Sequence, residues 1–140
     1  MPYKFLEDEA IADIAFEAEG KNLNDLFQSA AEATIVSMAD PATIKNNITK
    51  IITKKANTIK ELLFELIEEI IYLKDKDAIV FHSVTVEVNE EKKTCTATLT
   101  GDDINHETQA LRNDVKAITM HYYTVEKTTD GWEAHIVLDI

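Results

Sequence analysis

Two aspartates interrupt apolar stretches near the two ends of the sequence. Asp13 lies in the run AIADIAF, and Asp139 lies in HIVLDI, directly before Ile140. A buried charge without a partner is costly, so each carboxylate must be solvated, paired or bound to a ligand. If the two segments pair as strands, the carboxylates converge with the α-carboxylate of Ile140. Such an all-oxygen site suits a hard cation such as Ca²⁺ or Mg²⁺. Two ordinary solvated aspartates are the alternative.

No residue set for nucleophilic or nucleotide chemistry is visible. The sequence has no G-x-S-x-G, C-x-x-C or H-E-x-x-H motif, and its three glycines leave no phosphate-cradling loop. His82, His121 and His135 fall in predicted strands, where packed or surface roles are commoner than metal ligation, and His106 falls in a polar loop. We therefore expect no enzymatic activity of the chain itself, and a stand-alone metal-dependent hydrolase conflicts with the missing nucleophile and base.

The composition predicts one acidic, soluble domain over residues 1–140. The net charge is −12 and hydrophobic residues make up 45% of the chain. An acidic surface opposes binding to phosphate backbones, so we expect no DNA binding and no direct RNA binding, but docking to a cation or a basic partner. The lone Cys95 is predicted to be an inward-facing hydrophobe, and a single cysteine favours a cytoplasmic location. With no signal-peptide pattern and no run of roughly 20 apolar residues, no membrane association is expected.

Two amphipathic helices are predicted, over residues 22–38 and 58–75. Asn22 caps the first helix, and Thr58 with Glu61 forms the T-x-x-E capping box of the second. Apolar residues recur with helical period in both, which indicates packing on a sheet. The polar face of the second helix is acidic, and we expect it to be solvated, with docking of a basic partner as the alternative. That face consists of Glu61, Glu65, Glu68 and Glu69.

The remaining apolar segments predict strands. Residues 46–56 carry lysines typical of an edge strand, and the alternative role for these lysines is contact with an anionic ligand. Asp130-Gly131 predicts a tight hairpin turn. The expected fold is α+β, a two-layer sandwich with a largely antiparallel sheet of five to seven strands and two helices packed on one face. The other predicted strands cover residues 78–88, 94–101, 115–127 and 132–140.

The ordered set of motifs resembles the archease family. That family has a strand ending in Ala-Asp, then a glycine and an alanine-rich L-x-x-L-F helix, matched here by Ala12-Asp13, Gly20 and residues 23–27. The helix ending IIYLKD, the block VKAITMH and the terminal IVLDI continue the match over essentially the whole chain. One departure is that Ala10 and Ile11 stand where the family often has His-Thr, so any role of that histidine is lost or passes to Glu7 or Glu9.

The resemblance implies a small protein cofactor of an RtcB-type RNA ligase in tRNA splicing. Archeases promote guanylylation of the ligase and its multiple turnover, and RNA is reached only through the ligase. The resemblance also implies a divalent-cation site formed by Asp13, Asp139 and Ile140, with Ca²⁺ expected and Mg²⁺ or Mn²⁺ as alternatives. The alternative function is a chaperone-like or scaffolding module that binds a basic protein through the acidic helix face.

Overall fold

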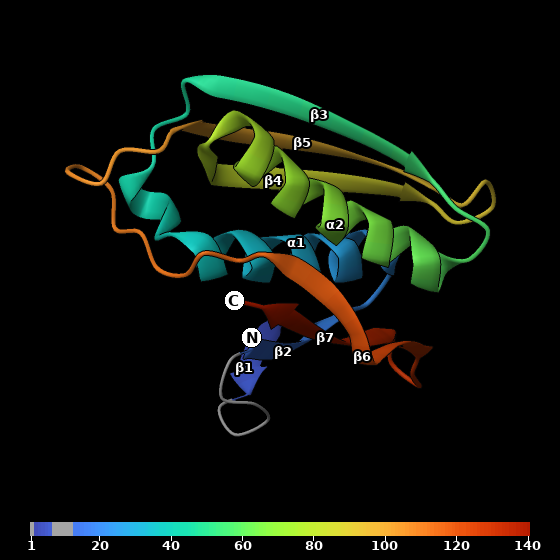
Figure 1. Cartoon of the computed structure of the whole chain (residues 1–140). Helices are drawn as coiled ribbons and strands as arrows, with labels where there is room; N and C mark the ends of the chain where they lie inside the picture. The colour runs from blue at the N-terminus through green and yellow to red at the C-terminus, as the bar shows by residue number, and fades with distance from the viewer. Residues whose placement is uncertain (1, 7–12) are drawn as a thin grey trace.

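The computed structural model describes residues 2–6 and 13–140 (Figure 1). Ala10 and Ile11, and with them Glu7, Glu9 and Ala12, lie outside the described residues. The described elements, in chain order, are β1 (Tyr3–Leu6), β2 (Asp13–Gly20), α1 (Leu23–Met38), the 3-10 helix η1 (Pro41–Thr43), β3 (Ile48–Lys55), α2 (Ile59–Asp77), β4 (Ile79–Asn89), β5 (Thr94–Asp103), β6 (Ala117–Lys127) and β7 (Trp132–Asp139).

The described strands form two antiparallel sheets, with the orders β1-β2-β7-β6 and β3-β5-β4. The predicted α+β class and antiparallel pairing are confirmed, while the seven strands divide into two sheets in place of one. Both helices contact both sheets, α1 through β2 and β4, and α2 through β3 and β6. Figure 1 shows α1 between the three-stranded sheet and the four-stranded sheet.

The sheet divides because side chains of α1 occupy the free edge of β4. The side-chain oxygen of Gln28 accepts a hydrogen bond from Val86 N–H at 2.9 Å, and its amide donates to Val84 O. The oxygen of Asn24 accepts from Val88 N–H at 2.7 Å. Since these side chains satisfy the edge, β4 needs no further strand as a neighbour.

The predicted helix starts are confirmed. Asn22 accepts a hydrogen bond from Asp25 N–H at 2.9 Å, and the Thr58 hydroxyl accepts from Glu61 N–H at 3.1 Å. In α2, Ala78 ends the helix in the left-handed conformation with φ of 51°. Within the described residues, no helix has the length and apolarity needed to cross a membrane.

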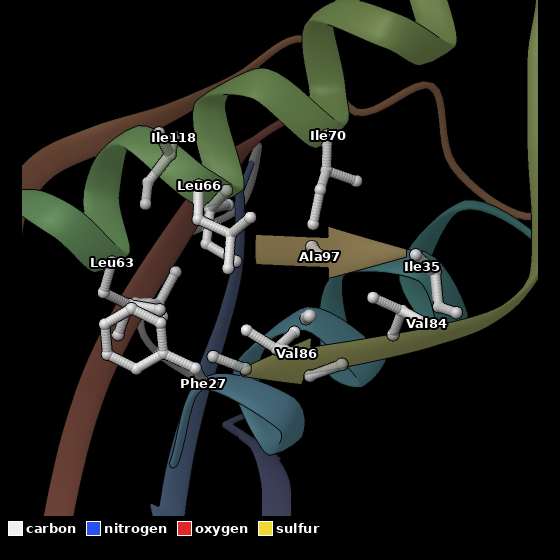
Figure 2. Packing of buried hydrophobic residues seen from close by; sticks show 14 of the residues in the cluster. Phe27, Ile35, Leu63, Leu66, Ile70, Val84, Val86, Ala97 and Ile118 are labelled. Atoms are coloured by element: carbon white, nitrogen blue, oxygen red, sulfur yellow. The ribbon is translucent and has the colours of Figure 1, made fainter. Parts of the chain in front are cut away.

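The core fills the space between the helices and the inner faces of the two sheets. Figure 2 shows side chains of α1 and α2 meeting those of β4 and β5, with Ile118 of β6 on the same side. Gly20 is required where β2 meets α1, because a Cβ there would collide with the backbone of Asp25 and Leu26. This packing fixes β2 and β7, the strands that carry Asp13 and Asp139.

Candidate functional site

Asp13 and Asp139 lie directly opposite one another in the register of β2 and β7. Opposed residues of an antiparallel pair project from the same face, with Cβ atoms about 4.5–5.5 Å apart. Their neighbours Ile14 and Leu138 contact the core, so the two carboxylates lie on the outer face of the sheet, at its end nearest the carboxyl end of α1. The strand pairing brings the aspartates together as their spacing predicts, whereas metal binding stays a prediction.

The donors at this place fit a hard divalent cation. Two ionised carboxylates directly opposite one another repel, so an intervening cation would stabilise the strand pair. Among the described residues, no group of three His, Cys, Asp or Glu side chains could hold a metal ion. A third donor to such a cation would have to come from the backbone, and Ile140 follows Asp139 directly. An oxygen-only set favours Ca²⁺, Mg²⁺ or Mn²⁺ over zinc.

Neighbouring backbone holds the end of β7 in place. The carbonyl of Asp139 accepts a hydrogen bond from Lys116 N–H at 2.8 Å, and Ala117 of β6 lies opposite Asp139. Asp139 is thus flanked by Asp13 on one side and by a small side chain on the other. The side chain of Ile140 packs against the core, which fixes the backbone just beyond Asp139.

A segment between β5 and β6 ties the carboxyl end of α1 to this site. Arg112 donates from its guanidinium to Val36 O at 2.9 Å, and the Asn113 amide donates to Ser37 O at 3.1 Å. Helix ends leave such carbonyls without partners, so these bonds stabilise α1. Arg112 and Asn113 also line, with Asp13, a depression of about 360 Å³. A guanidinium is suited to phosphate oxygens, and sequence reasoning missed Arg112 because it lies in a polar loop without a motif.

The same segment is fixed to α2 through a buried lysine. Lys74 is 5% exposed and lies 2.8 Å from Asp114 and 2.7 Å from Asp75. Burial alone would lower the pKa of Lys74, but its hydrogen bonds to Asp114 and Asp75 outweigh burial and raise that pKa. The hydrogen bond from Lys74 lowers the pKa of Asp114. Next to this ion pair is a cavity of about 520 Å³ with Val80 and Leu111 in its lining.

The acidic face of α2 is partly neutralised by β3. Lys54 lies 3.0 Å from Glu69, and Lys50 lies 3.2 Å from Asp77. Strand β3 is an edge strand, as its lysines predict, but two of those lysines bind carboxylates of α2. Of the four glutamates of the expected solvated face, Glu61 and Glu68 are exposed, Glu65 is half-buried and Glu69 is paired with Lys54.

The four histidines lie in the kinds of element that the sequence predicts, three in strands and one in a loop. His82, in β4, has Nδ1 3.0 Å from Pro41 O, and His106 lines the cavity beside Lys74. His121 and His135 lie on β6 and β7, where both rings pack near Tyr122. The strand positions of the three predicted strand histidines are confirmed.

Residues 3–140 match the Archease protein family. This chain belongs to the archease family. It is 33% identical over 141 residues to protein archease of Archaeoglobus fulgidus, with 100% of both chains covered. It is 31% identical over 141 residues to protein archease of Methanosarcina barkeri, with 99% of this chain and 95% of the relative covered. The resemblance inferred from motifs is thereby confirmed.

Solved structures show the same archease fold. The solution structure of Methanobacterium thermoautotrophicum protein 1598 superposes with a TM-score of 0.84 at 24% identity, covering 99% of both chains. The crystal structure of a Thermotoga maritima archease, described as a possible chaperone, gives a TM-score of 0.63 at 17% identity, covering 96% of both chains. These likenesses support the arrangement of two antiparallel sheets with helices between them.

Proposed function

We propose that this archease activates an RNA ligase of the RtcB type by promoting its guanylylation and multiple turnover. The family match over residues 3–140 supports the proposal. The observation that carries it is the register pair of Asp13 with Asp139, because two opposed carboxylates at the ends of two paired central strands suit a bound cation. The chain itself contributes no bond-making step.

The residues of the site would act by binding and orientation. Asp13, Asp139 and a backbone oxygen of Ile140 would hold a divalent cation, whose positive charge can stabilise phosphate oxygens during nucleotidyl transfer. Arg112, which lines the same depression as Asp13, can donate to a phosphate of the nucleotide or RNA held by the ligase. The net charge of −12 steers the protein toward a basic cleft.

A chaperone-like or scaffolding role is the second candidate, since the Thermotoga maritima relative is described as a possible chaperone. That role would use the acidic face of α2. Because Glu69 already binds Lys54, this face offers a basic partner less free charge than the sequence suggests. A Glu61→Lys, Glu68→Lys variant tests it: we expect ligase stimulation to be unchanged, and loss of ligase binding would favour the scaffolding role.

Substitution of Asp13→Asn tests the cation site in two assays. In a multiple-turnover joining assay with the RtcB-type ligase, we expect the variant to lose stimulation. In thermal unfolding with EDTA, we expect the variant to be about 0.2–1 kcal/mol more stable than wild type, because it removes repulsion with Asp139. Added Ca²⁺ should stabilise the wild type and leave the variant unchanged, since ligand binding stabilises only a chain that binds it.

Glu87→Gln is the matched control, because Glu87 is an exposed carboxylate on β4 in the other sheet. It should leave both stimulation and the response to Ca²⁺ unchanged. Full stimulation by the Asp13→Asn variant would contradict the proposed role of the site. A Ca²⁺ response that persists in that variant would show that cations bind elsewhere on the protein.

A further inference from the structure

Strand β6 contains a large bulge opposite β7. The register passes from the Thr119–Val137 pair to the Thr124–His135 pair, so the four residues 120–123 lie opposite the single residue Ile136. Bulges re-aim side chains and are frequent next to functional sites. We call residues Met120, His121 and Tyr122 the β6 bulge.

Both sides of the sheet hold the β6 bulge in a strained conformation. Tyr122 has φ of 57°, which is costly for a residue with a Cβ. On the inner side, buried Tyr123 donates a hydrogen bond to Lys60 O at 2.7 Å, and its ring packs on Phe64 of α2. On the outer side, His135 Nδ1 lies 2.8 Å from Tyr122 O, and because a carbonyl only accepts, Nδ1 is the donor.

The positive φ of Tyr122 accommodates the extra residues of the bulge and does not lie at a turn between two elements. The other non-glycine residues with positive φ in the described chain are Ala78 and Lys93, which lie at the end of α2 and in the turn between β4 and β5. Tyr122 alone among the three lies inside a strand. A bulge that keeps a strained residue inside a strand is a pointer to function.

The strained segment presents large side chains to solvent. Met120 is 65% exposed and Tyr122 is 66% exposed, and the His121 ring packs 4.1 Å from the Tyr122 ring. Tyrosine and methionine are enriched in protein–protein interfaces, where a few such anchors supply most of the binding energy. The β6 bulge therefore has the composition of an interface anchor held rigid before binding.

The charges on the same outer face point to a basic partner. Glu19, Glu133 and Glu126 form a row, each directly opposite the next across β2, β7 and β6, and all three are exposed. Like charges directly opposite one another destabilise a sheet, so the row gains stability when cationic groups bind it. Glu17, opposite His135, lies 3.6 Å from Lys4 and is partly neutralised by it, so the free charge of this face comes from the glutamate row.

The β6 bulge is also close to the paired aspartates. His135, which contacts Tyr122, precedes Asp139 by four residues on β7. At about 3.3 Å per residue, the two lie about 13 Å apart along the strand, well within the span of one protein–protein interface. One partner can therefore cover the bulge, the glutamate row and the Asp13–Asp139 site together.

We propose that the β6 bulge anchors this outer face to a basic protein surface, with the glutamate row meeting lysines and arginines of that surface. The proposal rests on the proposed function, in which the partner is the RNA ligase. It assigns affinity to the β6 bulge and activation to Asp13 and Asp139. Single-stranded RNA stacked on Tyr122 is the competing occupant, which the glutamate row disfavours.

A double variant, Met120→Ala with Tyr122→Gly, tests the anchor. Glycine accepts the positive φ without strain, so the variant removes the ring while keeping the fold. Stimulation of the ligase is measured at rising archease concentration. We expect the archease concentration that gives half-maximal stimulation to rise at least 10-fold in the double variant, while the maximal stimulation is retained. The Asp13→Asn variant, in contrast, should lose the maximal stimulation and still bind the ligase.

Two exposed residues elsewhere provide matched controls. Tyr72 on α2 is 53% exposed and Ile51 on β3 is 68% exposed, and we expect Tyr72→Ala and Ile51→Ala to leave the half-maximal concentration unchanged. An unchanged half-maximal concentration in the double variant overturns the anchor and leaves the proposed function standing. A wild-type protein that neither binds nor stimulates the ligase overturns both. RNA binding that depends on Tyr122, measured by fluorescence polarisation, also overturns docking to a protein.

Discussion

The thiol of Cys95 illustrates what burial alone does to a reactive residue. Its side chain is 2% exposed on β5, and burial raises its pKa to about 11. The thiolate is the reactive form of cysteine, so at neutral pH this side chain is a protonated hydrophobe. The alternation of TCTATLT predicts an inward orientation for Cys95, and the structure confirms it.

We expect the native protein to resist thiol labelling. At pH 8, a disulfide reagent such as DTNB should modify Cys95 in the folded chain at least about 100-fold more slowly than in the urea-unfolded chain. In the folded chain the raised pKa reduces the fraction of thiolate, and burial prevents the reagent from reaching the sulfur. Labelling at equal rates in the two states would show that β5 opens readily.

At the scale of elements, side chains of α1 satisfy the edge of β4, and Gln28 makes the largest number of these contacts. Gln28 uses its amide oxygen for Val86 N–H and its amide nitrogen for Val84 O and Glu32. The helix α1 thereby acts as the neighbour that the edge of β4 lacks. An edge satisfied in this way is also protected from pairing with other chains.

Substitution of Gln28→Leu should destabilise the fold. The variant keeps the side-chain volume but leaves the N–H of Val86 and the carbonyl of Val84 without their partners, and we expect a loss of about 1–3 kcal/mol in free energy of unfolding. Urea denaturation measures this loss. Gln109→Leu is the control, because the hydrogen bonds of Gln109 to Asp103 and Asn105 lie in a solvent-exposed loop, and it should change stability by less than about 1 kcal/mol. Equal effects of the two substitutions would contradict a special role for the β4 edge.

At the scale of the whole molecule, the Lys74–Asp114 ion pair joins α2 to the segment that precedes β6. The partners are 40 residues apart in sequence. Lys116, two residues after Asp114, binds the Asp139 carbonyl, so the ion pair also supports the end of β7. The stability of this connection depends on pH because both partners have shifted pKa values.

Substitution of Asp114→Asn should reveal that pH dependence. The folded-state pKa of Asp114 is lowered, so its stabilising contribution is present above the ordinary value of about 3.9 and is lost as the pH falls through the folded value. The raised pKa of Lys74 makes the contribution present below about 10.5 and lost as the pH rises further. We expect a loss of about 0.5–1 kcal/mol at pH 7, since the Asp114 carboxylate is largely exposed and Asp75 remains.

Thermal unfolding at pH 7 and at pH 2.5 checks this expectation, and the difference from wild type should be smaller at the lower pH. A Lys74→Met variant removes the same ion pair from its other side. Because Asp114 and Asp75 are exposed and stay solvated, its loss of stability at pH 7 should also shrink as the pH falls. An equal loss of stability in Asp114→Asn at the two pH values would assign that loss to something other than the ion pair.

The sequence by itself determined the local features of this protein. The caps at Asn22 and Thr58, the apolar period of both helices, the Asp130-Gly131 hairpin and the inward Cys95 all follow from neighbours a few residues away. The convergence of Asp13 with Asp139 could also be predicted from the sequence. Each carboxylate interrupts an apolar strand, and pairing of the two strands places the carboxylates opposite one another.

Only the tertiary structure decided how the strands divide into two sheets and where β6 departs from regular pairing. The division into two sheets depends on Gln28 and Asn24 reaching β4 across long sequence separations, and no local pattern encodes such contacts. The β6 bulge has one counterpart in the sequence, the seven-residue spacing of the apolar residues Ile118 and Val125. Both contact the core, and residues an odd number of positions apart lie on opposite faces of a regular strand. This spacing can be interpreted as a bulge only once the register with β7 is known. Alternation is a local property of a strand, whereas the residue opposite each position depends on the tertiary structure.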